Sequence, residues 1–142
     1  MPIVIGYRMG LRYTCIMKLI NIKHITDLHN DALRGLEFYN QELTILQERL
    51  EEIAVDNSHP EVLEKVDYYQ NQFTIHQRCI DDLRHDLHKN LKHIEEEVST
   101  TSGFFGESNF TENEYLYEQY VTEEKLFNEL RHEFNRFAAI WM

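Results

Sequence analysis

The segment ITDLHNDALRGLEFYNQELTILQERLEEI (residues 25–53) carries the repeat from which the fold class can be read. Its apolar residues recur at alternating steps of three and four, which is the seven-residue repeat of helices packed along a common seam. The seam positions of this segment are Ile25, His29, Ala32, Leu36, Tyr39, Leu43, Leu46, Leu50 and Ile53. We therefore predict a long helix over residues 26–55.

The same spacing returns twice further along the chain, after two breaks. The second seam is Val62, Val66, Tyr69, Phe73, His76, Ile80, Leu83, Leu87, Asn90 and Ile94, and the third is Leu116, Tyr120, Glu123, Phe127, Leu130, Phe134, Phe137 and Trp141. The first break lies at residues 56–59, and Pro60 follows it. Proline fixes φ and lacks an N–H donor, so it suits the first turn of a new helix. The second break is a polar, glycine-containing loop at residues 99–109. The sequence thus predicts further helices over about 60–98 and 112–141.

Two capping boxes mark where the second and third helices are expected to begin. Ser58 precedes Glu61 by three residues, and Thr111 precedes Glu114 by three. At this spacing each side chain satisfies a free backbone N–H of the first helical turn. Because the connections are short, consecutive helices should be antiparallel neighbours. We predict an all-α fold, an elongated antiparallel three-helix bundle (up-down-up) with coiled-coil-like heptad packing, as a single domain over residues 25–142.

The charge of the chain is unevenly distributed. Residues 1–24 contain four basic residues and no acidic one, whereas residues 25–142 contain ten basic and 25 acidic residues, a net charge of −15. Such an acidic surface repels the phosphate groups of nucleic acids and of anionic lipids. The chain also has no run of about 18 apolar residues. We therefore expect neither nucleic acid nor a membrane as a partner.

The basic, apolar N-terminal segment (residues 1–24) differs from the regular sequence that follows it. Met17 opens the stretch from which the sequence becomes orderly, and this suggests that residues 1–16 are either not native or poorly ordered. Cys15 and Cys79 stand alone, without a CxxC pair or a dense cysteine framework. Isolated cysteines of this kind are typical of reduced thiols, so we expect a cytoplasmic protein.

Several seam positions carry polar side chains. They are His29, Tyr39, His76, Asn90 and Glu123. Counting residues outward from the two turns places Tyr39 opposite His76, and places His29 level with Asp86 and Glu123. We therefore expect a buried Tyr39–His76 pair and a second buried polar layer. Because buried polar groups need partners, both layers could simply satisfy themselves and fix the register of the helices.

An alternative interpretation of the second layer is a metal site. His29 and Glu123, together with His85 or Asp86, would supply imidazole and carboxylate ligands at one level of the bundle. Ligands of these types suit a divalent metal such as Zn, Fe or Mn. The hypothesis names His29, His85, Asp86 and Glu123 as the metal ligands.

Motifs of catalysis are weak in this sequence. Glu129 and His132 have the ExxH spacing of di-iron helical bundles, and Asp82 and His85 nearly repeat it. All four residues fall on positions that point away from the seam, whereas a di-iron site needs inward ligands. No HExxH, GxSxG or phosphate-binding loop is present. We therefore identify no catalytic residue.

Exposed apolar residues point instead to binding between proteins. Phe38 and Ile45 are seven residues apart and lie off the seam of the first helix, while Phe104 and Phe105 lie in the second loop. Either the N-terminal segment or a second chain must cover Phe38 and Ile45, and we favour a homodimer. The sequence thus indicates a small acidic helical bundle that acts as a protein-interaction or self-assembly module. The alternative is a metal-binding bundle.

Overall fold

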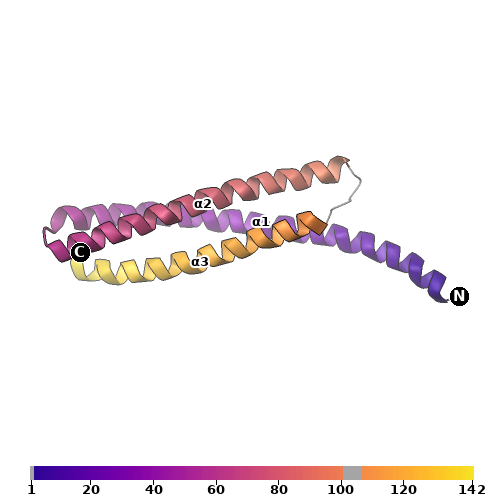
Figure 1. The fold of residues 1–142 in the computed structure, drawn as a ribbon, viewed down its shortest axis with the longest axis horizontal. Coiled ribbons are helices and arrows are strands. Elements are labelled where there is room, and N and C mark those ends of the chain that lie inside the picture. The colour runs from indigo at the N-terminus through magenta and orange to yellow at the C-terminus, as the bar shows by residue number, and fades with distance from the viewer. Residues whose placement is uncertain (1, 101–106) are drawn as a thin grey trace.

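The computed structural model describes the backbone of residues 2–100 and 107–142, and the side chains of residues 22–97 and 111–142. It contains three helices, α1 (Pro2–Asp56), α2 (Pro60–Thr100) and α3 (Glu107–Trp141). Each helix packs against the other two in an elongated up-down-up arrangement (Figure 1). The described residues form no strand. The predicted all-α three-helix bundle is confirmed.

The N-terminal segment is part of the first helix. α1 begins at Pro2 rather than near residue 26, so residues 2–25 continue the same helix. Figure 1 shows this part of α1 running on past the ends of α2 and α3. It therefore leads away from the bundle and does not fold back over it.

The start of α2 is where the sequence predicts it, but the capping residue is different. Pro60 is the first helical residue. The backbone N–H of Glu61 donates to Nδ1 of His59 (3.3 Å), and the His59 carbonyl accepts from the N–H of Val62 (3.1 Å). His59, rather than Ser58, therefore caps α2. The reason is that Pro60 has no N–H, so the first free donor is that of Glu61, two residues beyond His59.

α3 begins one turn earlier than the capping box at Thr111 indicates. Its first helical residue is Glu107, so Thr111 lies inside the helix. Asn113, three residues before Leu116, is a buried seam residue at 2% exposure. Trp141, which the spacing also places on the seam, lies at the end of α3 and is 37% exposed.

The core follows the predicted seam along the length of the bundle. Every seam residue predicted between Ile25 and Phe137 is buried, and Phe73, Phe127 and Phe134 are among the largest fully buried side chains. The rings of Tyr69 and Phe134 lie 5.2 Å apart, and Tyr69 and Phe137 lie 5.1 Å apart. Aromatic contacts of this kind add to the area they bury. This continuous apolar core surrounds the polar seam residues and limits which partners their side chains can contact.

Candidate functional site

His76 and Glu123 form a buried polar pair between α2 and α3. The exposed fractions of the two residues are 7% and 6%. Nδ1 of His76 is in direct contact with Oε1 of Glu123. The His76 ring also packs edge-on against Phe127, with 5.9 Å between the ring centroids. The pair places a carboxylate in the apolar core, where it depends on the imidazole for its hydrogen bond.

Tyr39 is buried as predicted, but its partner is not His76. Its ring packs against Phe127, 5.0 Å between centroids, and its hydroxyl interacts with Asn128 and Glu124 of α3. Burial raises the pKa of Tyr39 above its ordinary value, and the charge of Glu124 raises it as well. The predicted Tyr39–His76 pair is wrong, because Tyr39 turns towards α3 and the ring of Phe127 contacts both side chains.

A second buried polar layer joins all three helices near the other end of the bundle. Nδ2 of Asn90 lies 3.0 Å from Nε2 of His29 and also donates to Oδ1 of Asn113. His29, Asn90 and Asn113 are at most 5% exposed. The expected layer of His29, Asp86 and Glu123 does not form. The two layers exist, but the count from the turns assigned their members incorrectly.

His29 is held in its neutral form by this layer. Asn90 donates to Nε2, so the ring hydrogen of the neutral imidazole is on Nδ1, which is buried and has no hydrogen-bond partner in the described structure. Burial lowers the pKa of His29 below 6.5, although an interaction with Asn113 raises it in part. Protonation would place a second hydrogen on Nε2, where Asn90 already donates.

The stability of the fold should depend on the protonation of His29. In the unfolded chain His29 takes up a proton near its ordinary pKa of 6.5, whereas burial lowers the pKa of His29 in the folded chain. The contribution of neutral His29 to stability is therefore complete above about pH 6.5 and decreases as the pH falls below it. When the pH is lowered from 7 to 5, we expect the free energy of unfolding to fall less in a His29→Gln variant than in the wild type, as measured by urea unfolding. The exposed His88, changed to Gln, is the control, and equal pH slopes in wild type and His29→Gln would contradict the prediction.

The four proposed metal ligands are not brought together. His85 and Asp86 are exposed on α2, while Glu123 contacts His76 and His29 contacts Asn90. Within the described part of the chain, no group of three His, Cys, Asp or Glu side chains could hold a metal ion. The predicted metal site of these residues is therefore wrong. Asp82, His85, Glu129 and His132 are exposed, as their outward positions predicted.

The predicted interaction residues of α1 are exposed. Phe38 is 50% exposed and Ile45 is 43% exposed, although both are large apolar side chains. By helical spacing they lie on the same face of α1 as Glu42, which forms an ion pair with Arg131 of α3 at 3.7 Å. Phe104 and Phe105, the other predicted contact residues, lie outside the described residues.

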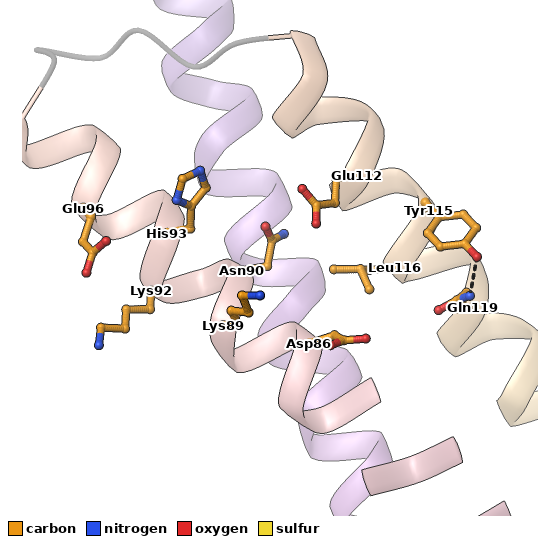
Figure 2. Close-up of a pocket in the computed structure, with 10 residues that line it drawn as sticks. All are labelled: Asp86, Lys89, Asn90, Lys92, His93, Glu96, Glu112, Tyr115, Leu116 and Gln119. Carbon is orange, nitrogen blue, oxygen red and sulfur yellow. Dashed lines mark hydrogen bonds between the residues drawn. The ribbon is translucent and has the colours of Figure 1, made fainter. Parts of the chain in front are cut away.

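A groove runs between α2 and α3, and it was not predicted from the spacing of residues. Figure 2 shows its end near the second connection, with one wall formed by α2 and the other by α3. This part has a volume of about 680 Å³. The side chain of Gln119 donates to the hydroxyl of Tyr115 (2.7 Å) on the α3 wall. A neighbouring cavity of about 600 Å³ continues the groove towards Cys79 and Leu126.

Sequence reasoning missed two features that the repeat could have revealed. Asn113 lies three residues before Leu116, so extending the alternating spacing one step back would have placed it on the seam. Leu126 is 47% exposed and lines the cavity between α2 and α3. Only the packing of α2 against α3 identifies it as part of that surface.

Among the helices that the structure describes, none is both long and apolar enough to span a lipid bilayer. Comparisons with known proteins identify no family for this chain. It matches no protein-family model, and no curated protein and no solved structure is significantly similar to it.

Proposed function

We propose that this protein acts as a self-assembly module, a helical bundle that forms a homodimer through the Phe38/Ile45 stripe, the apolar surface of α1 formed by these two residues. The observation that carries the proposal is that both side chains remain about half exposed in the folded chain. Large apolar side chains repeated along one helix face are what a partner chain buries in a helical interface.

The course of α1 supports a second chain as the cover. The sequence left open whether the N-terminal segment or another molecule covers the stripe. Because α1 continues without interruption from Pro2 to Asp56, the N-terminal segment runs away from Phe38 and Ile45. Cover from within the same chain would require that helix to break and turn back.

The charges beside the stripe are compatible with a symmetric dimer. Asp31 and Arg34 form an ion pair on the exposed surface of α1, and Glu42 pairs with Arg131 of α3. Both signs of charge therefore occur along this face, despite the net charge of −11 for the chain. A twofold interface brings the same patch of each copy together, so mixed charges avoid the repulsion that a wholly acidic face would produce.

The mass of the protein in solution tests the proposal. We expect light scattering during size-exclusion chromatography to give twice the chain mass of 17.1 kDa. Replacing Phe38 with Glu should weaken the dimer at least about tenfold, because it places a charge in the apolar centre of the interface. Ile45→Glu should act in the same direction.

The matched control is Val55→Glu, which makes the same kind of change on the same helix. Val55 is 84% exposed and lies near the end of α1, outside the stripe. Its variant should remain dimeric. A monomeric wild type, or dimers that tolerate Phe38→Glu as well as they tolerate Val55→Glu, would contradict the proposal. As part of this proposal we place the module in the cytoplasm, on the basis of its two isolated cysteines.

A further inference from the structure

The groove between α2 and α3 is a second surface, on a different side of the bundle from the Phe38/Ile45 stripe. The cavity of about 600 Å³ that extends towards Cys79, called the central cavity below, is lined by Leu83 and Leu126 among others. Tyr115 lines both this cavity and the one of about 680 Å³ beside it. Leu126 is 47% exposed and Tyr115 is 58% exposed. The groove therefore offers apolar surface that the described side chains do not cover.

The central cavity is also strongly acidic. Four carboxylate side chains line it, and no lysine, arginine or histidine does; the four are Asp82, Asp86, Glu118 and Glu123. Within the described part of the chain, ion pairs engage only Glu123 of these four, through its contact with His76. Desolvation, followed by the charges of Glu123 and Asp82, raises the pKa of the Cys79 thiol beside them. The negative charge is therefore concentrated in this cavity, whereas the adjoining cavity is lined by Lys89, Lys92 and His93 as well as by acidic residues.

The length of the groove suits a helix. The two cavities share Asp86, Tyr115 and Gln119, so they form one continuous depression. On α2 the lining residues extend from Cys79 to Glu96, which corresponds to about 25 Å of helix at 1.5 Å per residue. A partner helix of four to five turns would lie along this distance in the same way that the three helices of the bundle lie along one another.

We propose that the α2/α3 groove binds a basic, amphipathic helix of a partner protein. The apolar face of that helix would cover Leu126 and Tyr115, and its lysine or arginine side chains would pair with Asp82, Asp86 and Glu118. Charge complementarity selects this occupant. Residues 25–142 of a second copy are a poor occupant, because they carry a net charge of −15 and would bring acidic surface against an acidic groove.

A designed peptide tests the proposal directly. The probe is an 18-residue amphipathic helix of leucine and lysine, labelled for fluorescence anisotropy and added to the full chain at physiological salt. We expect saturable binding of one peptide per chain. Glu118→Lys and Leu126→Glu should each weaken it about tenfold or more, since one removes a charge-assisted contact and the other an apolar contact. A leucine/glutamate helix of equal length should not bind.

Matched controls separate this site from general attraction to an acidic protein. Glu48 is exposed on α1, and Glu48→Lys changes the net charge of the chain as much as Glu118→Lys does. Binding should persist in Glu48→Lys and also in Phe38→Glu. Equal weakening by Glu48→Lys and Glu118→Lys, or equal binding of a scrambled leucine/lysine peptide, would overturn the proposal. It would also be overturned if spermine bound the groove as tightly as the peptide, since the ligand would then be a small polyamine.

Discussion

Replacing His76 with leucine is expected to lower the free energy of unfolding by about 3 kcal/mol. Leucine is apolar and suits the core, so packing alone would predict a small effect. The loss arises from Glu123, whose carboxylate is 6% exposed and contacts Nδ1 of His76. Without the imidazole, the buried Glu123 side chain loses its hydrogen-bond partner, and an unsatisfied buried polar group destabilises the folded state.

The double variant His76→Leu/Glu123→Leu distinguishes this cause from loss of packing. It removes both members of the pair, so no polar group remains without a partner, and we expect it to recover most of the stability lost in His76→Leu. Urea unfolding of the wild type, both single variants and the double variant gives the coupling energy. If the losses of the two single variants simply add, His76 and Glu123 do not stabilise each other.

The sequence was sufficient to predict that there are three helices and which residues form their core, but not that α1 begins at Pro2. Alternating steps of three and four need only the local sequence, and every seam residue from Ile25 to Phe137 is buried in the structure. The break at Pro60 was also predictable, because proline limits the backbone wherever it occurs. The start of α3 was not, because the Thr111 capping box matches a helix start by its residue types while α3 begins at Glu107.

The partners of the buried polar residues depend on the offset between helices. The count from the second turn assumed that α2 and α3 diverge symmetrically from it. Instead Glu123 contacts His76 rather than lying level with Asp86, so α3 is displaced along α2 towards the α1–α2 turn. Between α1 and α2 the predicted position of His29 is wrong by about one helical turn, because His29 contacts Asn90 instead of lying level with Asp86. Local spacing does not contain this offset, because interlocking side chains on three helices determine it together.

The α2/α3 groove was beyond sequence reasoning for the same reason. Each of its walls consists of ordinary exposed positions when its helix is considered alone. Only the distance and offset between α2 and α3 bring Asp82, Asp86 and Glu118 to one cavity with Leu126. The Phe38/Ile45 stripe, by contrast, lies on one helix, so a seven-residue spacing within α1 was enough to predict that the two residues share a face.

Gly35→Ala is expected to destabilise the protein by about 2 kcal/mol, against the usual preference of helices for alanine. Gly35 lies inside α1, where exchange of glycine for alanine would by itself favour the helix by about 1 kcal/mol. At this position, however, a Cβ atom would overlap the hydroxyl of Tyr120 on α3 and lie only 2.9 Å from its Cζ atom. Tyr120 is 9% exposed, so its ring cannot move aside without disturbing the core.

Tyr120→Phe separates the steric effect from helix propensity. Without the hydroxyl, a Cβ at position 35 still lies close to the ring, but its most severe overlap is gone. Gly35→Ala should therefore cost less stability in the Tyr120→Phe background than in the wild type, measured by urea unfolding of all four proteins. If Gly35→Ala instead raises stability by about 1 kcal/mol in both backgrounds, helix propensity outweighs the contact. Gly35 would then not be required for the close approach of α1 and α3.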